Sequence, residues 1–308
     1  MSFQNILVDV DASAGSHPAL DQAIDLARRC GARLKVVDVV SVPREARLYL
    51  DEAVPSALVS RRRELLDQLV TAARDLSVES EILRGRPAIA LIQEVLRSGH
   101  DLLMRSHARD IATHGPRRFG SVDMQLFRYC PCPVWAVVPA AQTRPQRILA
   151  AVHATPDDAA EQTLNERILG LASLVNEIER GSLTVLQAWT AFGVEFLQSR
   201  STDEEIEAYI DAARRPAEEA LKQLVAGMGP RLADARIQLP KGHPEDVIPE
   251  YVVSEGIDLV VMGTVARTGI PGMIIGNTAE RVLQRLLCSV LAVKPDGFET
   301  PVRLDSAE

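Results

Sequence analysis

The segment that decides the fold is Asp258–Leu283, which reads DLVVMGTVARTGIPGMIIGNTAERVL. Its apolar start is typical of a buried strand ending at Met262, and its last residues are typical of a helix beginning near Thr278. The loop between them is rich in glycine, which allows positive φ angles and a close approach to a ligand. This pattern predicts an anion site, because free N–H groups and the helix dipole attract phosphate. A plain loop before a helix capped by Asn277 or Thr278 is an equally simple interpretation.

The chain repeats this layout once. Apolar runs begin near Asn5 and again near Arg147, and many later features recur at an offset of 156 or 157 residues. We interpret the repeat as a duplication, with a first domain over residues 1–140 and a second over residues 146–297. The recurring pairs are Gly85 and Gly242, Asp101 and Asp258, Gly120 and Gly276, and Pro139 and Pro295.

Within each half, short apolar runs alternate with longer amphipathic segments. Strands buried on both faces and separated by helices indicate parallel pairing, because parallel strands need a long crossover. The pattern predicts an α/β fold of two tandem doubly wound, Rossmann-like domains, each with a five-stranded parallel sheet flanked by helices. Ligands of such sheets bind at the carboxyl ends of the strands. The expected strands are residues 4–10, 33–40, 77–83, 101–105 and 133–138, then 146–152, 182–189, 234–239, 258–262 and 289–294.

The composition argues against several classes of partner. The 308 residues carry 34 basic and 42 acidic side chains, a net charge of −8, which gives no general attraction to nucleic acid or anionic membranes. Aromatic residues make up 4%, too few for a base-stacking surface. No apolar run approaches the roughly 20 residues that span a bilayer, and the first residues lack a signal-peptide pattern. With four scattered cysteines, we expect a reduced, cytoplasmic protein.

The loop and the repeat together resemble the universal stress protein family, and in particular its tandem, two-domain type. That family carries the motif Gly-x-x-Gly-x(9)-Gly-[Ser/Thr] between the fourth strand and the last helix, where it binds nucleotide phosphates. Gly263 and Gly276 match its first and last glycines. The acid Asp11 at the end of the first strand and Cys132-Pro133 before the last strand are further family features. The resemblance covers both halves and implies a stress-response protein that binds ATP or another adenine nucleotide.

By this resemblance, the nucleotide site lies in the second half, with departures from the motif. Ala266 replaces the middle glycine, Asn277 replaces the final Ser/Thr, and His153 replaces the aspartate that contacts the adenine side. An alanine in a left-handed conformation costs roughly 1–2 kcal/mol, so we expect a distorted loop that binds weakly or in an adapted form. The implied binding residues are His153, Ala188, Met262, Gly263, Arg267, Gly276, Asn277 and Thr278.

The first half shows the reverse pattern, because it keeps Asp11 but lacks the upstream glycines. Its loop is basic, which we interpret as a solvated loop rather than a site for an anion other than ATP. We therefore expect no ATP binding in the family manner here. The degenerate site comprises Asp11, Val39, Gly120 and Ser121, and the basic residues are Arg105, Arg109, Arg117 and Arg118.

No catalytic motif of the GxxxxGK[ST], GxGxxG, GxSxG or HExxH type occurs, and the Cys130-Pro-Cys132 spacing is unlike common zinc sites. We therefore predict no metal and favour a non-enzymatic protein whose nucleotide occupancy reports stress to protein partners. One alternative is slow ATP hydrolysis in the second half. Another is a nucleotide-independent scaffold, or a binder of another small anionic or lipid-like ligand. The sequence leaves the partner proteins and pairing into a homodimer open.

Overall fold

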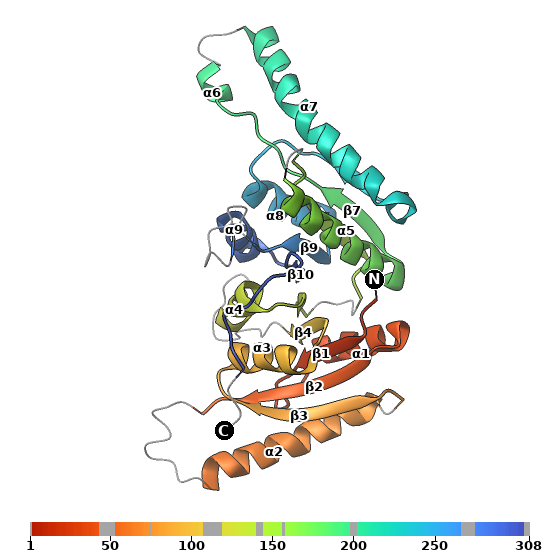
Figure 1. Cartoon of the computed structure of the whole chain (residues 1–308), viewed down its shortest axis with the longest axis vertical. Coiled ribbons are helices and arrows are strands. Elements are labelled where there is room, and N and C mark those ends of the chain that lie inside the picture. Colours follow the sequence, from red (N-terminus) through yellow and green to blue (C-terminus); the bar gives the residue numbers. More distant parts are fainter. Residues whose placement is uncertain are drawn as a thin grey trace. The chain divides into compact units, whose positions relative to one another are not determined.

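The computed structural model describes residues 2–42, 53–73, 75–106, 119–139, 144–155, 158–197, 202–265 and 275–304. The chain divides into two compact units, one of residues 1–144, 289–292 and 298–308 and the other of residues 145–288 and 293–297. Helices pack beside the strands within each unit (Figure 1). Within the described residues, we find no helix with the length and apolarity that a membrane crossing requires.

The first unit is a parallel sheet with the strand order β3-β2-β1-β4-β5. Residues 289–292 of this unit add an antiparallel strand to β5, with Val290 opposite Ala136. An added strand covers backbone groups that an edge would leave unpaired. The elements are β1 (Asn5–Asp9), α1 (Pro18–Cys30), β2 (Arg33–Val40), α2 (Ala53–Val70), β3 (Val78–Arg84), α3 (Pro87–Ser98), β4 (Leu102–Ser106), α4 (Ser121–Tyr129) and β5 (Val134–Val137).

The second unit contains the strand order β8-β7-β6-β9, all paired in parallel, which matches β3-β2-β1-β4 of the first unit. Its long helix α7 buries only residues of its C-terminal half, and the N-terminal half extends past the strands (Figure 1). The elements are β6 (Arg147–Ala151), α5 (Ala159–Glu179), β7 (Ser182–Leu186), α6 (Val194–Leu197), α7 (Asp203–Gly227), β8 (Arg236–Gln238), α8 (Pro244–Glu255), β9 (Leu259–Gly263) and α9 (Asn277–Arg285). The last strand of the chain is β10 (Ser289–Val293), whose residues 289–292 are the added strand of the first unit.

The predicted α/β fold is therefore confirmed, and nine of the expected strands agree with the structure to within two residues at each end. The exception is β7, expected to end at residue 189, which ends at Leu186. Beyond Leu186 the pairing continues only at single points among the described residues, through the Gln187 N–H to the Gln238 carbonyl at 3.0 Å and an isolated bridge between Trp189 and Lys241.

The repeated aspartates have a structural explanation. Asp101 accepts hydrogen bonds from the backbone N–H groups of Gln4 and Asn5 at 2.7 and 3.1 Å. Asp258 accepts from the corresponding N–H groups of Gln146 and Arg147, both at 2.9 Å. Each carboxylate satisfies donors at the start of the first strand of its unit, so the same residue recurs at the same place.

The Gly-x-Pro repeat is a strand-to-helix turn. Gly85 and Gly242 have φ angles of +132° and +144°, which residues with a side chain rarely adopt. Their N–H groups donate to the carbonyls of Val40 and Trp189 at 3.2 and 2.8 Å. The proline that follows each glycine by two residues is the first residue of α3 or α8, where its missing N–H is not needed.

Candidate functional site

A cavity of about 970 Å³ lies in the second unit at the carboxyl ends of β6, β7 and β9. β6 pairs with β7 on one side and with β9 on the other, so the crossovers leave it in opposite directions. A doubly wound sheet binds its ligands at this kind of switch point. Helices α5, α7, α8 and α9 contribute the remaining walls.

The residues implied by the family motif line this one cavity. His153 follows β6, Ala188 follows β7, and Met262 and Gly263 end β9. Gly276, Asn277 and Thr278 line it from the start of α9. Arg267 lies outside the described residues, as does Ala266.

Two buried amides fix the turn that carries His153. The side-chain oxygen of Asn165 accepts from the His153 N–H at 3.1 Å, and its nitrogen donates to the His153 carbonyl at 2.7 Å. Gln187 binds Ala154 in the same two-point way, at 2.9 and 3.1 Å. Asn165 is 3% and Gln187 1% exposed, so each amide satisfies backbone groups that water cannot reach. The motif did not identify these residues, because their role depends on contacts 12 and 33 positions away.

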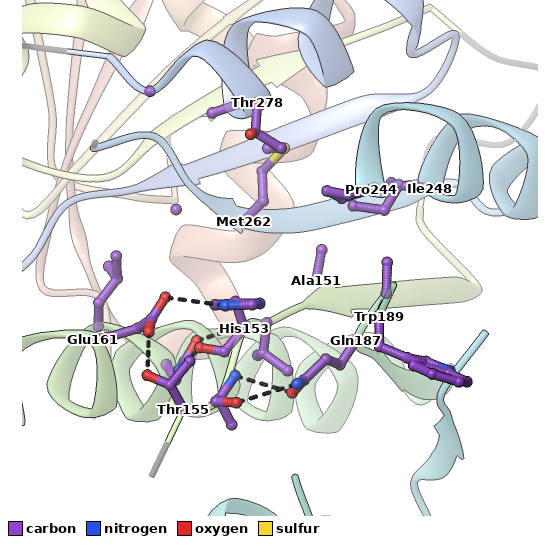
Figure 2. Close-up of a pocket in the computed structure, with 18 of the residues that line it drawn as sticks. Ala151, His153, Thr155, Glu161, Gln187, Trp189, Pro244, Ile248, Met262 and Thr278 are labelled. Carbon is purple, nitrogen blue, oxygen red and sulfur yellow. Dashed lines mark hydrogen bonds and ion pairs between the residues drawn. The ribbon is translucent and has the colours of Figure 1, made fainter. Parts of the chain in front are cut away.

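The His153 end of the cavity is polar (Figure 2). The Nε2 atom of His153 lies 4.0 Å from Oε1 of Glu161, and the Thr155 hydroxyl donates to Oε2 of Glu161 at 2.6 Å. Asp158 caps α5 by accepting from the N–H groups of Ala160 and Glu161. This end therefore presents two carboxylates and an imidazole that is one-third exposed.

The other walls are largely apolar. These walls include Trp189 from the segment after β7, Pro244 and Ile248 from α8, and Met262 from β9 (Figure 2). The indole N–H of Trp189 donates to the Leu239 carbonyl at 3.2 Å, so the ring offers the cavity an apolar surface. Helix α7 contributes three small residues that the sequence did not associate with the site, namely Ala213, Pro216 and Ala217.

Helix α9 begins at the cavity without a side-chain cap. Gly276 is its N-cap residue, with φ −74° and ψ 140°, and Asn277 is already the first helical residue. The interpretation of Asn277 or Thr278 as the cap is therefore wrong, since Gly276 holds the N-cap position and has no side chain. Uncapped N–H groups of a first turn, together with the helix dipole, favour an anion.

Gly263 has a packing role besides its place in the motif. A Cβ atom at this position would lie 2.9 Å from Cδ2 of Leu164 and 3.5 Å from Cδ1 of Ile168. The glycine thus allows α5 to pack closely on the end of β9. Since Leu164 and Ile168 also line the cavity, a side chain here would alter its shape.

The four predicted residues of the first unit lie after β1, in β2 and at the start of α4. Asp11 is exposed and pairs with Arg62 at 2.5 Å, and Val39 lies within β2. Gly120 is the N-cap of α4 and donates its N–H to Asp123 at 2.9 Å, and Ser121 is the first residue of that helix. Residues 107–118, including Arg109, Arg117 and Arg118, lie outside the described residues.

Arg105 is not part of a solvated loop, so that prediction is wrong for this residue. It belongs to β4 and forms ion pairs with Asp9, at 3.1 Å, and with Asp123. Asp9 and Asp123 are 8% and 2% exposed. Burial raises the pKa of Asp9 to about 6, although the guanidinium of Arg105 acts to lower it. No local pattern in the sequence indicates this cluster, because the register of β1 and β4 brings Asp9 to Arg105, and α4 adds Asp123.

Among the residues that the structure describes, no three histidine, cysteine or acidic side chains cluster as metal ligands would. The sulfur atoms of Cys130 and Cys132 lie 3.6 Å apart in the interior. The pKa of Cys132 is raised well above its usual value by its contact with Cys130 and by burial, which disfavours the thiolate that binds metals.

Comparison with known proteins identifies the family. A family model described as the Universal stress protein family matches residues 2–138 and 145–294. Universal stress protein E of Escherichia coli (strain K12) is 31% identical over 317 residues, which cover 99% of this chain and 98% of that protein. The crystal structure of a functionally unknown protein from Pseudomonas aeruginosa PAO1 has a TM-score of 0.68 and 27% identity, over 96% of this chain and 93% of that chain. A more distant universal stress protein, solved in complex with cAMP, has 22% identity and a TM-score of 0.32, over 46% of this chain and 100% of its own. The chain therefore belongs to the universal stress protein family, as a tandem protein that is homologous over its whole length to universal stress protein E.

Proposed function

We propose that the second domain, residues 146–297, binds an adenine nucleotide such as ATP, and that this occupancy regulates contacts with partner proteins during stress. The observation that carries the proposal is the cavity at the switch point of β6, β7 and β9, which has an uncapped helix N-terminus on one wall. In this proposal the first domain, residues 1–140, holds no nucleotide.

The size of the cavity supports a ligand of this class. Its volume of about 970 Å³ is at the upper end of the ~300–1,000 Å³ of small-molecule sites. Its walls combine apolar surface from Trp189, Ile248 and Met262 with a few polar groups, which is typical of sites that bind an aromatic ring and fix its orientation.

The distribution of charge favours one orientation of the nucleotide. The carboxylates of Asp158 and Glu161 lie at the His153 end, where they would repel a polyphosphate. The N–H groups at the start of α9 would attract it. We therefore place the phosphates at Gly276, Asn277 and Thr278, and the base near His153, Ala188 and Met262, with Arg267 as a further phosphate contact.

Titration with ATP, ADP and AMP tests this proposal, with the fluorescence of Trp189 as the signal. The chain has two tryptophans, Trp135 in the first unit and Trp189 in the cavity wall, so a Trp135→Phe background leaves one reporter. The variant Gly276→Val places a branched side chain at the N-cap of α9, and we expect it to abolish binding. Gly120→Val makes the matching change at the N-cap of α4, and we expect it to leave binding intact.

Absence of a fluorescence change and of any bound nucleotide in the wild-type chain would contradict the proposal. Equal loss of binding in Gly276→Val and Gly120→Val would also contradict the placement of the site at α9, because it would indicate a general effect on folding. A different small molecule released from the purified protein would favour the alternative of another anionic or lipid-like ligand. ATP turnover that disappears only in Gly276→Val would add slow hydrolysis to the function.

A further inference from the structure

The two units can be compared position by position, because the same backbone hydrogen bonds recur in both. The Val10 N–H donates to the Val37 carbonyl in the first unit, and the Val152 N–H donates to the Leu186 carbonyl in the second. Two residues later along the first strand, the Ala12 N–H donates to Asp38 at 3.1 Å.

In the second unit the corresponding donor is the Ala154 N–H, which binds Gln187 at 2.9 Å. Asp11 therefore occupies the position of His153, and Asp38 occupies the position of Gln187.

Three positions that line the cavity of the second unit carry charged residues in the first. In β6 and β9, Ala151 is paired with Met262, and the same register in β1 and β4 pairs Asp9 with Arg105. Ala279 is the third residue after the N-cap of α9, and Asp123 is the third after the N-cap of α4. Arg105 binds both aspartates.

A second arginine enters the first unit from its helix α2. This helix lies between β2 and β3, the place in the chain that α7 has between β7 and β8. Where α7 contributes small residues to a cavity, α2 extends Arg62. The Nη1 atom of Arg62 donates to Asp11 at 2.5 Å and to the Ser13 hydroxyl at 2.6 Å, and Nη2 donates to Asp38 at 2.6 Å.

The contact with Asp38 is in the interior of the unit. The Asp38 side chain is 1% exposed and that of Arg62 17% exposed, and Nε of Arg62 lies 2.6 Å from the second Asp38 oxygen. Of the residues of α2, Leu66 is the one that is buried. Arg63, which donates to the Ser80 carbonyl at 2.8 Å, links the helix to β3. Arg62 is thus the residue that ties α2 to the ends of β1 and β2.

We propose that the ligand site of the first unit is closed from within by Arg62 and Arg105, whose aspartate partners stand at the positions that line the cavity of the second unit, and that Arg62 acts as a latch that holds α2 over the closed site. This inference concerns the first unit alone and does not depend on nucleotide binding by the second. In this proposal a ligand enters the site of the first unit only after Arg62 is released.

Hydrogen–deuterium exchange of α2 in the full chain tests the latch. The variant Arg62→Ala removes the guanidinium, and we expect exchange of the α2 amides to rise about ten-fold, as loss of a buried charge-assisted contact of this kind implies. Arg61→Ala is the matched control. Arg61 is on the same helix and carries the same charge, and its ion-pair partner within the described part of the chain is Glu64 of that helix, at 3.1 Å in an exposed position. We expect it to leave exchange unchanged.

Chemical rescue distinguishes a latch from a general loss of stability. Millimolar methylguanidinium chloride, compared with sodium chloride at equal ionic strength, should restore protection of α2 in Arg62→Ala and have no effect on the wild type. The variant Arg62→Lys keeps the charge but cannot form the fork of bonds, and we expect an intermediate rise in exchange. Equal exchange in the Arg62→Ala and Arg61→Ala chains would overturn the proposal. Rescue by sodium chloride alone, or no rescue by methylguanidinium, would also overturn it.

Discussion

Replacing Arg105 with methionine gives the first unit the residue that the second unit has at this register position, and it should strongly destabilise the first unit. The change leaves Asp9 and Asp123, which are 8% and 2% exposed, without their shared cation. Breaking a buried ion pair by removing one partner costs about 3–5 kcal/mol. We expect a loss of this size in the free energy of unfolding of the first unit at pH 8.

The loss should depend on pH in a defined direction. Burial raises the pKa of Asp9 to about 6, and the loss of the Arg105 charge will raise it further. Once Asp9 takes up a proton, one of the two uncompensated charges disappears. The destabilisation by Arg105→Met should therefore be smaller at pH 5 than at pH 8.

A triple variant separates the cost of unpaired charge from the cost of altered packing. Asp9→Ala, Arg105→Met and Asp123→Ala together give the first unit the residues of the second at all three positions. Because no buried charge is then left unpaired, most of the lost stability should return. A deficit of about 1 kcal/mol should persist, since Asp123 no longer accepts the Gly120 N–H at the start of α4.

Urea unfolding followed by tryptophan fluorescence measures these effects. Trp135 is fully buried in the first unit, so a Trp189→Phe background makes the signal specific to that unit. A loss below about 1 kcal/mol for Arg105→Met would contradict this prediction, because it would mean that the cluster is well solvated. A triple variant as unstable as the single variant would also contradict this prediction, because altered packing rather than unpaired charge would then be responsible for the lost stability.

Three further predictions concern individual side chains, each measured by urea unfolding. The pKa of Asp9 is raised from 3.8 to about 6, so protonated Asp9 adds about 3 kcal/mol to the free energy of unfolding below pH 4, and this contribution is lost as the pH rises through 6. Asp9→Asn should remove this dependence of stability on pH, and an unchanged dependence would contradict the assignment. The pH dependence of stability has the opposite direction for Glu94. Although burial acts to raise its pKa, hydrogen bonds from Lys35, Ser98 and Arg97 lower it from 4.5 to about 2. Ionised Glu94 therefore adds about 3 kcal/mol to the free energy of unfolding above pH 4.5, and this contribution is lost as the pH falls through 2. Glu94→Gln should abolish this acid-side loss. Gly242→Ala should lower the free energy of unfolding by about 1–3 kcal/mol, because φ is +144° and the new Cβ would lie 2.7 Å from Val247. Gly227→Ala, at a position with open space around it, should not lower the free energy of unfolding. Equal effects of the two substitutions would contradict the argument from backbone strain.

The sequence predicts the strands well, because each apolar run and each Gly-x-Pro turn is a local signal. The motif likewise points to positions such as Met262 and Gly276, which the structure brings to one cavity. The supporting residues could not be found in this way. Asn165 acts through the backbone of His153, and that pairing depends on how α5 packs on the sheet.

The misinterpretation of Arg105 has the same cause. Its basic neighbours in the sequence favour a solvated loop, and nothing local indicates an ion pair with Asp9, 96 residues away. The register of β1 and β4 creates that pair. The contact of Arg62 has no local signal either, since Arg62 is on α2 and its partner Asp38 lies 24 residues away in β2.

Nucleotide binding by the second unit can be tested by photoaffinity labelling with 8-azido-ATP, followed by peptide mapping. We expect the label in second-unit peptides that contain His153, Ala188 or Met262, and we expect excess ATP to prevent labelling. Label in the peptides of the first unit, or label that excess ATP does not reduce, would contradict it.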